Sequence, residues 1–99
     1  MTRMESYVIL GKFTPQGHRS APANAAQLDN VQQHARAVGA EVQSFHLTLG
    51  EYDVVAVIRA PDEKTMAKLS LAIGSTGNLR TLTLRAFPET EIRRLMRAL

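Results

Sequence analysis

The chain contains no cysteine and no tryptophan, and aromatic residues make up only 5% of it. Without cysteine it forms no disulfide, no thiolate metal site and no thiol nucleophile. This absence fits a reducing compartment, so we expect a cytoplasmic protein. No apolar run approaches the length of a membrane span, and the first residues are too polar for a signal peptide, so no membrane association is expected.

Sequence motifs that bind cofactors or metals are also missing. There is no phosphate-binding loop, no nucleophile elbow and no dinucleotide fingerprint. The three histidines, His18, His34 and His46, lack the spacing that brings two metal ligands together on one helix or strand. We therefore expect neither a cofactor nor a metal ion.

The size and charge of the chain suit a small self-associating domain. Its 99 residues predict one domain, residues 1–99. A chain this short buries only roughly 60–65% of its unfolded surface, and many such domains gain stability by associating. The net charge of +3 is modest, and part of it lies at Arg93, Arg94 and Arg97. Nucleic-acid binders concentrate more basic residues and add aromatic stacking groups, so nucleic acid is not an expected partner.

Apolar periodicity and capping signals predict the order β-α-β-β-α-β followed by one more helix. The predicted elements are a strand over 7–13, a helix from the N-cap Asn24 to Gly39, a hairpin over 41–60, a helix from Pro61 to Gly74, a strand over 80–87 and a helix from Pro88. This order predicts an α+β, ferredoxin-like sandwich. Both internal helices then cover one face of a four-stranded antiparallel sheet in the spatial order 4-1-3-2.

The predicted hairpin brings possible reactive groups together. With Gly50 and Glu51 as the two loop residues of a type II′ turn, the register of the hairpin follows. The resulting facing pairs are Leu49 with Tyr52, Leu47 with Val54, Phe45 with Ala56 and Gln43 with Ile58 on one side, and Thr48 with Asp53, His46 with Val55 and Ser44 with Val57 on the other. His46 is then diagonal to Asp53, within reach of its side chain.

The uncovered face of the sheet is predicted to be apolar at its centre and polar at its edge. We place ten residues on it: Ser44, His46, Thr48, Asp53, Val55, Val57, Arg59, Thr81, Thr83 and Arg85. Its apolar centre predicts that a partner covers it, and its polar edge predicts a solvent-filled cavity or rim. The last helix, with an apolar stripe at Ile92, Leu95, Met96 and Leu99, also needs a surface to pack against. We therefore expect a homodimer or higher oligomer.

Five residues are candidates for chemistry. His46 and Asp53 form a general base with its orienting carboxylate, or else Asp53 accepts hydrogen bonds from Thr48 or the turn amides while His46 fills space at an interface. Lys12, Tyr52 and Arg85 are candidates for ligand binding. The alternatives are that Tyr52 packs its ring in the core, and that the two cations pair with Asp53 or Glu51.

The sequence resembles the GYD family, named for the motif that appears here as Gly50-Glu51-Tyr52-Asp53. The resemblance spans residues 6–91 and includes Gly77-Asn78-Leu79-Arg80-Thr81 and Arg85-Ala86-Phe87-Pro88-Glu89. It implies a fold similar to the dimeric α/β barrels, in which two ferredoxin-like sheets associate. That wider group includes cofactor-free monooxygenases, lactone isomerases, haem-dependent enzymes and effector-binding domains, so the resemblance assigns no chemistry.

Three functional hypotheses follow. The first is a cytoplasmic homo-oligomeric domain that binds a small organic molecule between sheet and helices or between sheets. The second is a cofactor-independent oxygenase or isomerase, which needs an acid–base residue facing a cavity. The third is a regulatory or structural interaction module that uses the last helix.

Overall fold

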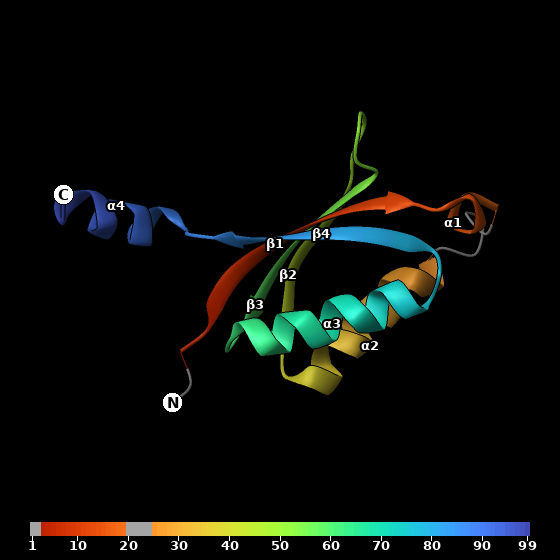
Figure 1. Ribbon diagram of the computed structural model, residues 1–99, viewed down its shortest axis with the longest axis horizontal. Coiled ribbons are helices and arrows are strands. Elements are labelled where there is room, and N and C mark those ends of the chain that lie inside the picture. Colours follow the sequence, from red (N-terminus) through yellow and green to blue (C-terminus); the bar gives the residue numbers. More distant parts are fainter. Residues whose placement is uncertain (1–2, 20–24) are drawn as a thin grey trace.

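The computed structural model describes residues 3–19 and 25–99. Its elements are β1 (Glu5–Phe13), α1 (Pro15–Arg19), α2 (Ala25–Val38), β2 (Glu41–Leu47), β3 (Val54–Ala60), α3 (Glu63–Ser75), β4 (Leu79–Ala86) and α4 (Glu89–Arg97). The strands form one antiparallel sheet in the order β2-β3-β1-β4. Helices α2 and α3 both lie on one side of it (Figure 1). The predicted ferredoxin-like α+β sandwich and its strand order are confirmed.

Local signals account for the helix ends. Gly39, with φ of +85°, follows α2, as predicted for a residue in the left-handed region. Asp62 caps α3 through hydrogen bonds that its carboxylate accepts from the Thr65 backbone N–H and hydroxyl, both at 2.8 Å. These bonds hold the pKa of Asp62 below its ordinary value because they stabilise the charged form. The N-cap predicted at Asn24 lies outside the described residues.

The segment predicted as a loop after β1 contains the short helix α1. The Thr14 hydroxyl accepts a hydrogen bond from the Gly17 backbone N–H at 3.0 Å and donates one to the Gly77 carbonyl at 2.6 Å. The backbone N–H of Thr14 also donates to the Asn78 carbonyl at 3.0 Å. The end of β1 is therefore fastened to the turn that precedes β4.

The core lies between the sheet and the two long helices. Ile58 and Leu69 are its largest fully buried side chains. The other buried apolar residues are Tyr7, Ile9, Val31, Ala35, Ala40, Val54, Ala56, Ala60, Met66, Ile73 and Leu79. On the strands these positions alternate, so one face of the sheet supplies the core and the other does not.

The predicted orientation of β4 is wrong. Thr83 pairs with Ile9, and Arg85 pairs with Tyr7. Directly paired residues project from the same face, so both side chains lie on the face covered by helices. The Thr83 hydroxyl lies 2.9 Å from that of Ser70 on α3. Alternation fixes the period of a strand but not which set faces inward, and here Thr81, Thr83 and Arg85 take the inner positions while Leu82 and Leu84 point outward.

A β-bulge overturns one predicted pairing of the hairpin. Ile58 pairs with Val42 rather than with Gln43, and Val57 pairs with Ser44. Gln43 is the extra residue and is exposed. The predicted pairs from Ser44 to Leu47 are confirmed, because the register shift occurs only beyond them.

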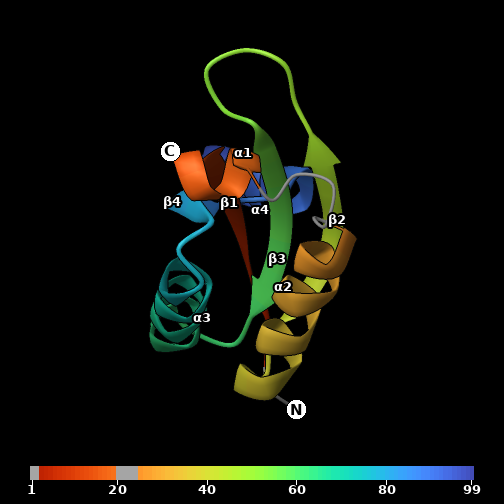
Figure 2. The same cartoon turned by 90° about the vertical axis from the view of Figure 1, so that its right-hand side faces the viewer.

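The β2–β3 connection is longer than the predicted two-residue turn. The Thr48 N–H donates to the Asp53 carbonyl at 2.8 Å, and the Thr48 hydroxyl donates to the Tyr52 carbonyl at 2.6 Å. Residues 49–52 therefore form the loop, in which Gly50 has φ of +112°. The loop rises from the sheet on the side away from α2 and α3 (Figures 1 and 2). Leu49 lies in this loop and is 99% exposed, so the predicted facing pair of Leu49 and Tyr52 does not form in the strands.

Helix α4 projects from the end of the sheet where β4 ends (Figure 1). The structure describes this helix in full, and none of its residues is buried. Its apolar stripe of Ile92, Leu95, Met96 and the following Leu99 is exposed by 38% to 103%. The predicted stripe has formed, but no described part of the chain buries it.

Candidate functional site

The open face of the sheet is more apolar than the sequence predicted. We use the term open face for the side not covered by α2 and α3. Two rows of paired residues cross it: Val57, Val8 and Leu84 in one, and Val55, Leu10 and Leu82 in the other. Leu82 and Leu84 are 47% and 44% exposed. Leu82 and Leu84 take the outward positions on β4 in place of the two threonines and the arginine predicted there, so among the described residues these two rows are wholly apolar across β3, β1 and β4.

His46 lies at the edge of the open face. It pairs with Val55, which places it at the β2 end of the row that continues to Leu10 and Leu82. The side chain is exposed. Among the described residues, no hydrogen bond or ion pair joins His46 to Asp53. The catalytic role of the two residues stays a prediction.

Asp53 fastens the β2–β3 loop to β1. Its carboxylate accepts a hydrogen bond from the Phe13 backbone N–H at 2.8 Å, and its own N–H donates to the Gly11 carbonyl at 2.9 Å. The alternative prediction, that the Asp53 side chain accepts hydrogen bonds from Thr48 or from the turn amides, is therefore wrong. Asp53 instead satisfies a backbone donor at the end of the central strand, where the ladder with β3 stops.

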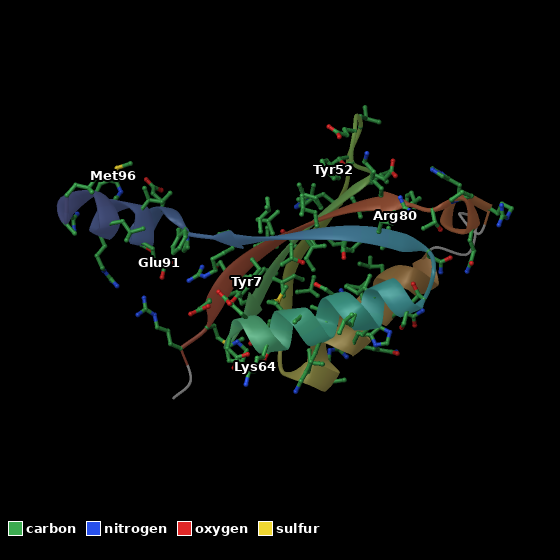
Figure 3. All side chains as sticks on the ribbon, viewed as in Figure 1. Tyr7, Tyr52, Lys64, Arg80, Glu91 and Met96 are labelled. Atoms are coloured by element: carbon green, nitrogen blue, oxygen red, sulfur yellow. The ribbon has the colours of Figure 1, made fainter. Side chains whose placement is uncertain are left out.

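Lys12 and Tyr52 come together at the same end of the sheet. The Lys12 ammonium lies 5.3 Å from the centre of the Tyr52 ring and 3.7 Å from a Glu51 carboxylate oxygen. Tyr52 is half-buried at the base of the raised loop (Figure 3). The ion pair with Glu51 was one of the two alternatives for Lys12. Because the pair is exposed, it contributes little to stability and leaves the cation accessible to a ligand.

Arg85 lies at the opposite end of the sheet, on the helix-covered face. Its guanidinium is 4.4 Å from the centre of the Phe87 ring and 5.5 Å from that of Tyr7. It forms an ion pair with Glu5 at 3.4 Å and donates to the Ser6 carbonyl at 3.0 Å and to the Ala86 carbonyl. The predicted ligand-binding residues therefore form two groups, Lys12 with Tyr52 at one end and Arg85 at the other.

Tyr7 belongs to the Arg85 group. Its hydroxyl donates a hydrogen bond to the Glu5 carboxylate at 2.8 Å. Burial, together with this hydrogen bond to an acidic partner, raises the pKa of Tyr7 to about 12. The phenol therefore stays protonated and acts as a fixed donor that orients Glu5 toward Arg85.

A second set of residues was missed by the sequence analysis. Gln43, Arg59 and Arg94 line a pocket of about 660 Å³ where the end of the sheet meets α4. Nothing in the sequence signals the bulge that exposes Gln43 or the path of α4 that brings Arg94 near Arg59.

Two features, a metal-binding cluster and a membrane-spanning helix, are absent from the described residues. Within residues 3–19 and 25–99, no cluster of three histidine, aspartate or glutamate side chains forms a metal site. None of the helices in that part of the chain has the length and apolar character needed to cross a membrane.

Comparison of the sequence with known proteins identifies its relatives. Residues 7–96 match the family model of the GYD domain. The chain is 31% identical over 90 residues to a Thermus thermophilus protein named glutamine synthetase and cystathionine beta-lyase binding protein. That alignment covers 90% of this chain and 95% of the relative.

Solved structures with lower sequence identity share the fold. A leucine response regulatory protein of Mycobacterium tuberculosis superposes with a TM-score of 0.59 at 21% identity, covering 85% of this chain. The chain spans about half of that regulator, 51% of its length. A NIPSNAP-like domain protein of Burkholderia xenovorans superposes with a TM-score of 0.53 at 15% identity, covering 89% of this chain and 87% of the other. The family model spans nearly all of the sequence, and the chain belongs to the GYD domain family.

Proposed function

We propose that this chain is a cytoplasmic, homo-oligomeric binding domain whose subunits associate through the open face of the sheet. One observation carries the proposal: the two apolar rows across β3, β1 and β4 are uncovered within the chain. Apolar patches of this kind on a folded domain mark interaction sites. A second copy with the same face supplies a self-complementary surface, as a two-fold dimer requires.

The binding role is supported by the relative from Thermus thermophilus, whose name describes a protein that binds two enzymes. In this proposal the domain acts by holding another molecule. One such molecule is a small organic ligand that binds at the polar rim of the open face and contacts Lys12 and Tyr52.

The decisive experiment is a matched pair of leucine-to-lysine substitutions. Leu84→Lys puts a charge into one of the two apolar rows of the open face, whereas Leu71→Lys puts the same charge on α3 at a position already 75% exposed. We expect the unsubstituted chain and Leu71→Lys to be dimers or larger by sedimentation equilibrium, and Leu84→Lys to be a monomer. Circular dichroism checks that both variants are folded. A monomeric unsubstituted chain at micromolar concentration overturns the proposal.

A second candidate is a protein-binding module that uses α4. The observation that favours it is the uncovered stripe on a helix that stands clear of the domain body. Such a helix suits a groove on a partner, where residues spaced along one stripe act as anchors. Leu95→Lys is then expected to weaken binding to purified glutamine synthetase of the same organism, measured by surface plasmon resonance, while Leu71→Lys leaves it unchanged. Equal binding by both variants would remove this candidate.

A further inference from the structure

The pocket beside α4 is built from three separate parts of the chain. Arg3 and Met4 lie in the segment before β1. Gln43 and Arg59 come from the β2–β3 pair, and Pro88, Glu91 and Arg94 come from the start of α4 and from α4 itself. Its volume of about 660 Å³ is in the range that holds a small organic molecule. Glu91, which lines it, lies on α4's side of the molecule, away from Tyr52 and the raised loop (Figure 3). The pocket is therefore a different place from the Lys12–Tyr52 rim.

The charges around this pocket are unbalanced. Three guanidinium groups line it, with one carboxylate, that of Glu91. Glu91 already pairs with Arg3 at 3.1 Å. In the described part of the chain, neither Arg59 nor Arg94 has an acidic partner within ion-pair distance. Two guanidinium groups thus line the same space without being held in an ion pair, although Glu41 is the cross-strand neighbour of Arg59.

The bulge in β2 supplies a neutral polar group to the same space. Gln43 was predicted to face inward beside Ile58, where an amide has no suitable surroundings. Gln43 is instead the extra residue of the bulge, and its side chain lines the pocket. Bulges commonly re-aim one side chain near a site while the rest of the strand keeps its register. The amide offers both a donor and an acceptor to a bound molecule.

We propose that this pocket binds a small organic anion that carries a carboxylate or a phosphate group. Arg59 and Arg94 hold the anionic group, since the planar fork of a guanidinium matches both oxyanions. The Gln43 amide contacts a polar group on the remainder of the ligand, and Met4 and Pro88 provide its apolar contacts. This inference goes beyond the proposed assembly, because it assigns a ligand class to a pocket at the end of the sheet beside α4.

The test is a titration followed by nuclear magnetic resonance on the full chain labelled with ¹⁵N. Inorganic phosphate and succinate are added separately, each at constant ionic strength maintained with sodium chloride. We expect saturable shifts of the Gln43 side-chain amide and the Arg59 and Arg94 guanidinium N–H signals. The probe that saturates at the lower concentration identifies the preferred oxyanion.

Three substitutions that each remove one positive charge separate the site from a general charge effect. Two of them test the site, and the third is the control. Arg59→Gln and Arg94→Gln are expected to weaken binding by at least about tenfold. Arg93→Gln should leave it unchanged, because Arg93 lies next to Arg94 on α4 but pairs with Glu89 at 2.7 Å. Chemical shifts that do not saturate overturn the inference. An equal loss of affinity in all three variants overturns it too. Repeating the titration with Leu84→Lys separates a failure of this site from a failure of the assembly.

Discussion

Both faces of the sheet are rich in branched apolar side chains, yet only one of them is covered within the chain. On β3, the core residues Val54, Ala56 and Ile58 alternate with Val55 and Val57, which look out from the open face. A strand that is apolar on both sides is typical of a sheet buried on both sides. The helix-covered face holds the core, whereas the open face carries apolar side chains that no described element of the chain covers.

The largest expected effect comes from making the same leucine-to-alanine substitution on the covered side and on the open face of the sheet. Leu69→Ala removes a fully buried side chain from α3 and should cost about 2–5 kcal/mol of unfolding free energy, since it leaves a cavity. Leu84→Ala removes a half-exposed side chain from the open face and should cost less than about 1 kcal/mol in dilute solution. Urea denaturation of both variants at low concentration measures the two costs. Equal costs would mean that the open face is packed within the chain.

The rim between the faces provides the next comparison. Asp53→Ala leaves the Phe13 backbone N–H without its acceptor and should cost about 1–3 kcal/mol. Asp53→Asn keeps a carbonyl acceptor and should cost less. His46→Ala, at an exposed position, should stay within about 0.5 kcal/mol of the unsubstituted chain. Thermal unfolding distinguishes these cases, and a large loss on substituting His46 would reveal a contact that this arrangement lacks.

Tyr7 makes the helix-covered face sensitive to alkaline pH. Its ordinary pKa of 10.0 is raised to about 12 in the folded chain, so the folded state keeps its proton longer than the unfolded state. The contribution of Tyr7 to stability is complete below pH 10 and is lost as the pH rises toward 12. Denaturation midpoints measured across this window should fall for the unsubstituted chain and for Tyr52→Phe. The decline should be smaller for Tyr7→Phe, and an equal decline would contradict the assignment.

A modest effect is expected at Asp62, which caps the start of α3. Asp62→Ala removes the hydrogen bonds to Thr65 and should destabilise the chain slightly. The pKa of Asp62 is below its ordinary value of 3.8 in the folded chain, so its contribution is present above that pH and lost as the pH falls through the lower folded pKa. The difference between the two proteins should therefore shrink in acid. A difference that persists unchanged at low pH would point to another cause.

Most of the architecture could be predicted because local signals agree with one another. The hairpin register from Ser44 to Leu47, the end of α2 at Gly39 and the start of α3 after Asp62 each depend on a few neighbouring residues. The orientation of β4 could not be predicted in this way. The threonines of β4 are suitable for a partly buried face, and its leucines are suitable for an interface. Which of the two sets faces the helices therefore depends on how β4 pairs with β1.

The candidate site shows the same division. The proximity of Lys12, Glu51 and Tyr52 follows from strand order and was within reach of the sequence. The pocket lined by Arg59 and Arg94 could not be predicted from the sequence. It depends on a β-bulge that has no sequence signal and on the direction that α4 takes after β4 ends.

Helix α4 also affects how association should be measured. A helix of nine residues is marginal by itself in water, because nucleation costs more than so few hydrogen bonds return. Whatever surface buries its stripe must also supply the free energy that keeps it helical. An observed dissociation constant is therefore a net quantity, the contact energy less the cost of ordering the segment. Helicity that rises with protein concentration would make that cost directly visible.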